Sequence, residues 1–230
     1  MLVERLGRVR AALPGTEAIF VEGGSTDRSG AVVDELAATY PWIRALHDDA
    51  VGNLAHAWRM GVAHATGTHV ALMDADLCHD PEFLPTLRRE LDAGADLAIA
   101  SRVEGLRVRM PHKALYRRGA TLLSGVSFRM ATGYRGRDPA HGFRMFRRAS
   151  YEAVIGTMQS AGNAWAIELV WRFMRRGLVV VETPVPYGRR IHGRDQLSAP
   201  REARRYAALL WRIVAERLAA WIRIGGGHAI

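Results

Sequence analysis

Short apolar runs alternate with amphipathic segments over residues 17–102, and this alternation restricts the fold more than any other feature. Each run is followed by a turn and then by a stretch with apolar residues at helical spacing. The runs predict four strands, at residues 17–22, 43–49, 69–76 and 95–102. Strands that are separated by helices favour an α/β fold with a mostly parallel sheet and helices on both of its faces.

The predicted helices carry their own boundary signals. A helix is expected over residues 3–13, and the Pro14-Gly15 pair ends it before the first strand. Ser25 is expected to be the N-cap of the next helix, because a serine hydroxyl can accept a hydrogen bond from a free backbone N–H group in the first turn. Pro41 ends that helix ahead of the second strand.

The pattern changes after residue 102, and the alternation becomes less regular. Helices are predicted at residues 113–133 and 163–177, a strand or loop leading into a helix at 138–154, and a β-branched strand at 178–187. No internal repeat or linker interrupts the chain. We therefore expect one domain over residues 1–198, followed by a C-terminal amphipathic helix and tail over residues 199–230.

Charge and cysteine content indicate the kind of partner and the cellular compartment. The chain has 32 Lys and Arg against 23 Asp and Glu, a formal net charge of +9 that arginine dominates. Such an excess fits an anionic partner such as a phosphate compound or an acidic membrane face, and biased codon usage alone would also produce it. Cys78 is the single cysteine, so no intrachain disulfide can form, which fits a cytoplasmic protein. No run of about 18 uncharged apolar residues exists, so no membrane-spanning segment is expected.

The third predicted strand ends in the sequence MDAD, which contains Asp74 and Asp76. Ligands of parallel α/β sheets bind beyond the carboxyl ends of the strands. Two carboxylates at such a place repel each other unless a cation bridges them, and Mg²⁺ or Mn²⁺ commonly takes one or two carboxylates together with substrate phosphates. The alternative is a pair of solvated turn aspartates. The apolar strand before the pair favours the metal site.

Two other strand ends carry groups that could meet a phosphate compound. The sequence VEGGSTD places Glu22 and a Gly-rich turn after the first strand, where free backbone N–H groups would approach a ligand. An ordinary connection between strand and helix is the alternative there. The sequence ASR places Arg102 at the end of the fourth strand, where its guanidinium group could pair with a diphosphate or could simply face solvent.

These features occur in order, and with further motifs they resemble one family. Over residues 2–198 the chain resembles the family-2 glycosyltransferases, which have the Rossmann-like GT-A fold of nucleotide-diphospho-sugar transferases. The resemblance is closest to their polyprenyl-phosphate mannosyl- or glucosyltransferase branch. The matching motifs are VEGGSTD, GNLAHAWRMGVAHATG, DADLCHDPE, ASR, DPAHGFR and AIELVWRFMRRGLVVVETPVPYGRRIHG.

The resemblance implies a function and a set of site residues. It implies inverting transfer of a hexose from a GDP-mannose-type or UDP-glucose-type donor to an acceptor, expected to be a polyprenyl phosphate at the inner membrane face. It assigns Asp74 and Asp76 to Mg²⁺ or Mn²⁺. The nucleotide-sugar is expected to meet Glu22, Ser25, Asp74, Ala75, Asp76 and Arg102. The expected catalytic residues are Asp76 and Asp138, and the expected acceptor-phosphate ligands are Lys113, Arg117 and Arg190.

The chemistry expected of Asp138 depends on the acceptor. A phosphate acceptor is already an anion and needs no general base. A hydroxyl acceptor would need a carboxylate such as Asp138 to take its proton. The metal would stabilise the leaving nucleoside diphosphate in either case.

Several departures from the family pattern keep alternatives open. The family begins with a strand that ends in Pro-x-x-Asn-Glu, and this sequence lacks it, so either the start lies upstream or the sheet is short of a strand. One carboxylate is missing before the Gly-Gly turn, and Cys78 replaces a frequent glutamine. Where the branch has an Arg-x-x-x-Ser signature, this sequence has Lys113 and Arg117. Where the branch has Ser-Lys-Leu, this sequence has Asp-Gln-Leu at residues 195–197. Two alternatives therefore stay open: a catalytically impaired GT-A-like binding or regulatory module, and a transferase with a hydroxyl acceptor. A nucleotidyltransferase is a weaker alternative, because such an enzyme would need a Gly-rich loop near the start of the chain.

The C-terminal segment predicts a basic amphipathic helix. Its apolar residues are expected on one side, with arginines beside them, which suits a peripheral position on a membrane through residues 199–224. Packing on the domain or on a dimer partner is the alternative. These apolar residues are Leu209, Leu210, Ile213, Val214, Leu218, Trp221 and Ile222. The arginine clusters carry no recognisable nucleic-acid motif, so no nucleic-acid partner is expected. His47, His79 and His141 lack metal-ligand spacing and are expected to be ordinary polar residues.

Overall fold

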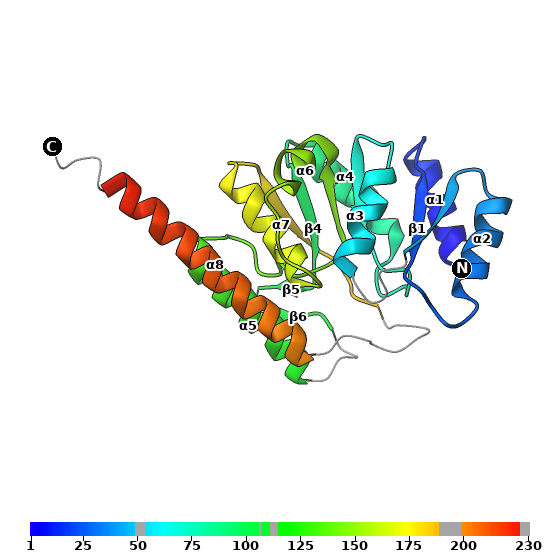
Figure 1. The fold of residues 1–230 in the computed structure, drawn as a ribbon. Helices are drawn as coiled ribbons and strands as arrows, with labels where there is room; N and C mark the ends of the chain where they lie inside the picture. Colours follow the sequence, from blue (N-terminus) through cyan, green and yellow to red (C-terminus); the bar gives the residue numbers. More distant parts are fainter. Residues whose placement is uncertain (49–53, 106, 111–114, 189–198, 226–230) are drawn as a thin grey trace.

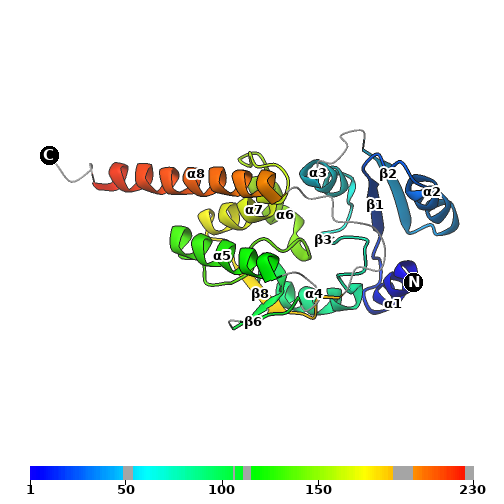
Figure 2. The same cartoon turned by 90° about the horizontal axis from the view of Figure 1, so that it is seen from below.

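The computed structural model describes the chain except for residues 49–53, 106, 111–114, 189–198 and 226–230 (Figure 1). Strands in the described part form a two-stranded sheet, a four-stranded sheet and a short two-stranded ribbon. Helices lie around the two larger sheets, and two long helices, α5 and α8, lie side by side at one end of the molecule (Figures 1 and 2). The α/β expectation is therefore confirmed.

The N-terminal unit follows the predicted alternation. It consists of α1 (Leu2–Ala12), β1 (Ala18–Glu22), α2 (Ser29–Thr39) and β2 (Ile43–His47), and β1 pairs with β2 in parallel. The expected N-cap at Ser25 is wrong. Helix α2 begins four residues later, and its first N–H group, that of Ser29, donates to the Asp27 carboxylate at 2.9 Å. Residues 23–28 form the connection between β1 and this helix.

The larger sheet has the strand order β3-β7-β4-β8. Its strands are β3 (His69–Leu72), β7 (Arg144–Arg147), β4 (Leu97–Ser101) and β8 (Val180–Pro184). β4 and β8 are parallel, but β7 runs antiparallel to both β3 and β4. The sheet is therefore mixed, because residues 144–147, predicted as a strand or a loop, enter between two strands that belong to the earlier alternation.

Strand β4 explains how the domain builds a core on both faces of this sheet. All five of its residues are buried. Leu97 and Ile99 belong to one apolar cluster, with α7 (Ala164–Arg175), whereas Ala98 and Ala100 belong to a second, with α4 (Leu84–Asp92). Alternate residues of a strand point to opposite faces, so a continuous apolar run supplies both cores. The sheet edge that carries the carboxyl end of β4 is thereby held rigidly.

Helix α3 (Leu54–His64) connects the two sheets on one face. Gly61 lies against β1, where an added Cβ would stand 3.3 Å from Val21 Cγ2. Trp58 and Val62 of the same helix pack in one cluster with Val70 of β3. In the described part of the chain no strand is hydrogen-bonded between β1 and β3, so the two sheets are joined through helix packing at this point.

Six further elements complete the described part of the chain. They are the 3-10 helix η1 (Pro81–Phe83), the hairpin strands β5 (Val103–Glu104) and β6 (Arg107–Val108), and the helices α5 (Leu115–Thr132), α6 (Arg148–Ile155) and α8 (Ala199–Gly225). The β5–β6 hairpin was not predicted, since two-residue strands leave no periodic pattern. None of the described helices is both long and apolar enough to cross a bilayer.

Helix α8 divides its apolar residues between two faces, which corrects the expectation of a single apolar side. Leu209 and Ile213 are buried in the main cluster, whereas Val214 and Leu218 are exposed. Trp211, Trp221 and Ile222 are exposed as well. The helix packs on the domain through one side, and its C-terminal half extends past the body of the molecule (Figure 1).

Candidate active site

The turn after β3 holds the two predicted metal ligands. Asp76 Oδ1 accepts the Cys78 N–H at 2.9 Å, and the Asp74 N–H is 3.3 Å from His79 Nδ1. Leu77 lies between these contacts with φ of 60°, a left-handed conformation that is uncommon for a branched residue and costs about 1–2 kcal/mol. The turn is thus held in a specific shape in which both aspartates follow the strand end.

His79 packs against this turn as a neutral imidazole. It is buried, stacks on Phe143 and makes an edge contact with His141. Burial disfavours the charged ring and lowers the pKa of His79 to about 4. A neutral ring leaves Nδ1 able to accept the Asp74 N–H, which fixes the tautomer. His79, expected to be an ordinary polar residue, is therefore a structural part of the turn.

The end of β4 brings in a buried ion pair. Arg102 Nε donates to Asp138 Oδ2 at 2.8 Å and Nη2 donates to Oδ1 at 2.7 Å, and the Arg102 backbone N–H donates to Oδ2 at 2.9 Å. Asp138 is fully buried. Burial alone would raise the pKa of Asp138, but the charge and hydrogen bonds of Arg102 outweigh it and lower the pKa to about 2. Asp138 is an anion whose main contact is the guanidinium group.

Glu182 holds the loop that carries Asp138. The backbone N–H of Asp138 donates to Glu182 Oε1 at 2.8 Å, and the Arg137 N–H and the Tyr134 hydroxyl donate to the same carboxylate, each at 2.9 Å. Glu182 lies in β8, next to β4. The sequence signal was the E-x-P motif, but nothing in that motif indicated which loop it binds.

Arg144 completes the loop from the other side. It is fully buried and donates from Nη1 to the Ala166 carbonyl at 2.7 Å and from Nη2 to the Pro139 carbonyl at 3.1 Å. A further hydrogen bond runs from Nε to the His141 carbonyl at 3.0 Å. Burial lowers the pKa of Arg144 to about 10, so it is still a cation at neutral pH. The motif DPAHGFR is therefore a loop closed by its own last residue.

Tyr187 and Gly188 connect these parts. The Gly188 N–H donates to the Cys78 carbonyl at 2.9 Å, and a Cβ on Gly188 would stand 3.0 Å from the Leu77 carbonyl oxygen. The ring of Tyr187 lies 5.9 Å from the Arg102 guanidinium carbon. The segment after β8 thus packs against both the aspartate turn and the ion pair, which makes one continuous site.

The structure brings together part of the predicted set. Asp74, Asp76, Arg102 and Asp138 share one sheet edge. Burial acts to lower the pKa of Arg102, but the charge and hydrogen bond of Asp138, with a smaller contribution from the charge of Asp74, raise it. Ala75 is exposed between the two aspartates. Predictions for Lys113 and Arg190 lie outside the described residues. Arg117 lies on α5, with its guanidinium carbon 5.8 Å from the Tyr116 ring centroid.

Glu22 and Ser25 belong to the N-terminal unit, where Glu22 ends β1 and Ser25 lies in the turn that follows. The Ser25 N–H donates to the Glu22 carboxylate, and His47 Nδ1 is 3.6 Å from Glu22 Oε2. Hydrogen bonds from Ser25, with a smaller one from His47, lower the pKa of Glu22. The predicted role of this turn at the nucleotide stays a prediction.

The aspartates form a donor set that suits a hard divalent cation. Both offer carboxylate oxygens, which Mg²⁺ and Mn²⁺ prefer, and neither the neutral His79 ring nor the buried Cys78 competes for such an ion. No group of three or more His, Cys, Asp or Glu side chains gathers for metal binding in the described part of the chain. An ion held by Asp74 and Asp76 would thus take its other ligands from water or a bound diphosphate.

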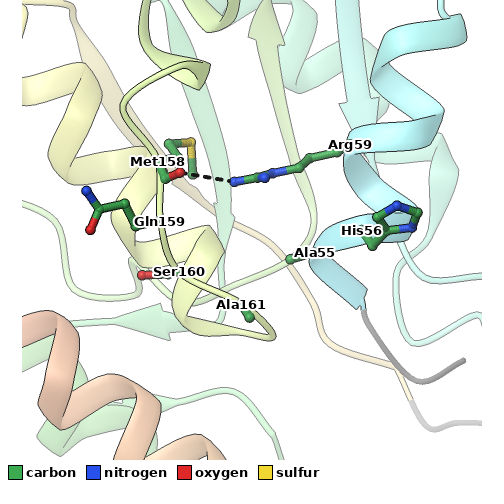
Figure 3. Close-up of a pocket in the computed structure, with 7 residues that line it drawn as sticks. All are labelled: Ala55, His56, Arg59, Met158, Gln159, Ser160 and Ala161. Carbon is green, nitrogen blue, oxygen red and sulfur yellow. Dashed lines mark hydrogen bonds between the residues drawn. The ribbon is translucent and has the colours of Figure 1, made fainter. Parts of the chain in front are cut away.

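One cavity is lined by none of the predicted site residues. It has a volume of about 190 Å³ between α3 and the loop that follows α6 (Figure 3). Arg59 points across it and donates to the Met158 carbonyl at 3.3 Å. His56, on its rim, is 2.8 Å from Asp48 Oδ1. The cavity is lined by packing and loop contacts and contains none of the predicted site residues.

Comparisons with known proteins agree with this architecture. A family model described as glycosyl transferase family 2 matches residues 1–155. The chain is 34% identical over 200 residues to the polyprenol monophosphomannose synthase of Mycolicibacterium smegmatis, covering 84% of this chain and 74% of that protein. It is 30% identical over 199 residues to the undecaprenyl-phosphate mannosyltransferase of Micrococcus luteus, covering 84% and 80%.

A solved structure shows the same fold. The glucosyl-3-phosphoglycerate synthase of Mycobacterium tuberculosis, in complex with Mn²⁺, UDP and phosphoglyceric acid, superposes with a TM-score of 0.67 at 19% identity, covering 93% of this chain and 72% of that one. The expected GT-A fold is therefore confirmed. On the family match and the two relatives, the chain belongs to glycosyl transferase family 2.

Proposed function

We propose that this protein is a metal-dependent, inverting glycosyltransferase that moves a hexose from a GDP- or UDP-sugar to a polyprenyl phosphate. The observation that carries the proposal is the ionised Asp138–Arg102 pair beside Asp74 and Asp76, at the carboxyl ends of β4 and β3. The names of the two curated relatives support the lipid-phosphate acceptor. The Mn²⁺ and UDP in the solved relative support the donor and metal classes.

The residues have separate tasks in this proposal. Asp74 and Asp76 hold Mg²⁺ or Mn²⁺, which when bound stabilises the charge of the leaving nucleoside diphosphate. Asp138 fixes the Arg102 guanidinium group at the same sheet edge, where it adds positive charge. Glu22, Ser25 and Ala75 approach the nucleotide, and Lys113, Arg117 and Arg190 face the acceptor side.

The state of Asp138 favours a phosphate over a hydroxyl acceptor. A general base must accept a proton near the working pH, whereas the pKa of Asp138 is lowered to about 2, its carboxylate is fully buried and both oxygens accept hydrogen bonds from Arg102. A phosphate acceptor is already negatively charged, so Asp138 does not need to accept a proton from it. Asp138 is therefore proposed as a positioning residue for Arg102.

Peripheral contact with the cytoplasmic face of a membrane is part of the proposal. The outward face of α8 exposes Trp211, Val214, Leu218, Trp221 and Ile222, and Arg201, Arg204 and Arg217 are exposed on the same helix. Tryptophan and arginine on one exposed helix face suit the boundary between lipid head groups and acyl chains.

Calorimetric titration tests the donor claim. GDP-mannose and UDP-glucose are titrated into the protein with Mn²⁺, and one of them is expected to bind. Asp76→Asn is expected to weaken binding at least tenfold, because one carboxylate of the metal site is lost. Asp92→Asn is the matched control, since Asp92 is exposed and pairs with Arg88 on the surface of α4. Equal affinity in both variants would refute the metal role.

Transfer of radiolabelled sugar to polyprenyl phosphate tests the reaction. The proposal expects labelled lipid with the wild-type protein and a large loss with Asp76→Asn. Donor binding without any transfer would instead support the binding-module alternative. Transfer only to a hydroxyl compound would contradict the acceptor.

A further inference from the structure

Helix α1 packs on the segment that leaves the aspartate turn, residues 74–80 (Figure 2). It contacts η1 and α4, and Val9 of α1 is buried in one cluster with Leu87 and Leu91 of α4. The first helix of the chain therefore lies against elements that follow β3, although β1 comes directly after it in the sequence.

Two ion pairs cross this contact. Arg5 Nη1 donates to Asp80 Oδ2 at 2.7 Å, and Arg8 donates from Nε and Nη2 to Glu82 Oε1 at 2.9 and 2.6 Å. The side chains of the Arg5–Asp80 pair are 33% and 34% exposed, against 61% and 45% for the Arg8–Glu82 pair. Water and salt screen a partly buried pair less than an exposed one, so the Arg5–Asp80 pair holds its two elements more firmly.

Asp80 is held by both of its carboxylate oxygens. Oδ1 accepts the Glu82 N–H at 3.0 Å and so caps η1, whereas Oδ2 accepts the hydrogen bond from Arg5. The carboxylate is thus fixed between α1 on one side and η1 on the other. Asp80 is therefore a fixed point at the exit of the aspartate turn.

A fixed exit matters because the turn is strained. Leu77 has φ of 60°, and such a conformation persists only where the surrounding structure holds it. At its start the turn is held by β3, which pairs with β7. At its exit Asp80 directly follows His79, whose Nδ1 accepts the Asp74 N–H at 3.3 Å. A displacement of Asp80 would therefore move the imidazole ring that positions the backbone of Asp74.

We propose that Arg5 is a positioning residue for the metal site. Through Asp80 it holds the exit of the aspartate turn, and it thereby keeps the carboxylates of Asp74 and Asp76 where one divalent cation can reach both. Arg5 itself supplies no ligand to a cation, because a guanidinium group has no acceptor atom. This inference rests on the proposed function, whose metal site it extends to α1.

Binding of Mn²⁺ to the full chain, measured by electron paramagnetic resonance in the presence of UDP or GDP, tests the inference. Arg5→Gln is expected to lower the Mn²⁺ affinity about tenfold, the smaller end of the effect of residues that orient metal ligands. Arg5→Lys keeps a positive charge beside Asp80 and is expected to restore part of the affinity. Arg8→Gln is the matched control on the same helix. Its partner, Glu82, lies outside the turn, so the affinity is expected to change less than about twofold.

Urea unfolding separates positioning from a purely structural contribution. A purely structural role would lower the unfolding midpoint of Arg5→Gln and leave the Mn²⁺ affinity of the folded protein unchanged. That result would overturn the inference, and so would an equal loss of Mn²⁺ affinity in Arg5→Gln and Arg8→Gln.

A second variant tests the route through Asp80. Asp80→Asn keeps an oxygen that can accept the Glu82 N–H but loses the charge that Arg5 meets. The double variant R5Q/D80N is expected to bind Mn²⁺ no more weakly than the weaker of the two single variants, because both act on one contact. Losses that add up would overturn the inference while the proposed function stands. A wild-type protein that binds no Mn²⁺ would overturn the proposed function, and this inference with it.

Discussion

The two larger sheets of this molecule differ sharply in how much they bury. All five residues of β4 are buried between two apolar clusters, whereas all five residues of β1 are partly exposed and α2, which packs beside it, has no buried residue. The four-stranded sheet therefore supports buried charges such as Asp138, while charges of the N-terminal unit, such as Glu22, are held by surface contacts. The two halves meet at α3 and at α1, whose Val9 is buried in one cluster with Leu87 and Leu91 of α4.

Removing one partner of an ion pair is expected to show this difference most strongly. Arg102→Ala leaves Asp138 buried and uncompensated, so the free energy of unfolding is expected to fall by about 3–5 kcal/mol. Arg44→Ala breaks the Arg44–Glu17 pair of the N-terminal unit, which has partly exposed partners at 3.6 Å, and is expected to cost less than about 1 kcal/mol. Urea unfolding of both variants measures the contrast, and equal losses would contradict it.

Protonation of a histidine is expected to change the free energy of unfolding in opposite directions in the two halves. The pKa of His79 falls from 6.5 to about 4 through burial, so the unfolded chain binds a proton that the folded chain does not. Stability from this group is present above about pH 6.5 and decreases as the pH falls toward about 4, by about 3 kcal/mol in all. His79→Gln should remove this part of the pH dependence of urea unfolding.

His47 of the N-terminal unit shows the opposite shift. Its hydrogen bond to Asp34, at 2.9 Å, and the charge of that carboxylate raise the pKa of His47 above 6.5. Its contribution is therefore fully present below pH 6.5 and is lost as the pH rises through the folded-state pKa. Proton NMR of the histidine rings is expected to show His47 titrating above 6.5 and His79 near 4. A shared midpoint would refute the comparison.

Backbone amide hydrogens are expected to exchange with solvent at different rates in the two sheets. Peptides that cover residues 18–22 should exchange faster than peptides that cover residues 97–101, because in the described part of the chain β1 pairs with β2 alone and all five of its residues are partly exposed. Hydrogen exchange with mass spectrometry measures this order. Equal protection would mean that α3 couples the sheets into one cooperative unit.

The smallest effect on stability is expected at the exposed face of α8. The variant W211S/W221S changes side chains with exposed fractions of 74% and 73%, so the free energy of unfolding is expected to change by less than about 0.5 kcal/mol per site. Binding to vesicles of anionic lipid, measured by sedimentation, is nevertheless expected to fall severalfold. L209A, at a buried position of the same helix, is the contrast: it should destabilise the protein by about 2–5 kcal/mol.

The sequence alone determined the local parts of this protein. The alternation over residues 17–102 predicted β1 to β4 and their helices, because hydrophobic periodicity reports how each segment is buried. Asp74 and Asp76 were placed at a strand end for the same reason. The motif order indicated the family, which the comparisons confirm.

Only the tertiary structure decided which distant groups meet. Arg102 pairs with Asp138, 36 residues later, and Glu182 binds the loop around Asp138 from 44 residues further along the chain. The antiparallel entry of β7 between β3 and β4, the two apolar faces of α8 and the contact of Arg5 with Asp80 also follow from packing. Periodicity says that a residue is buried or exposed, but the partner that neutralises a buried charge is chosen by contacts between elements that no local pattern encodes.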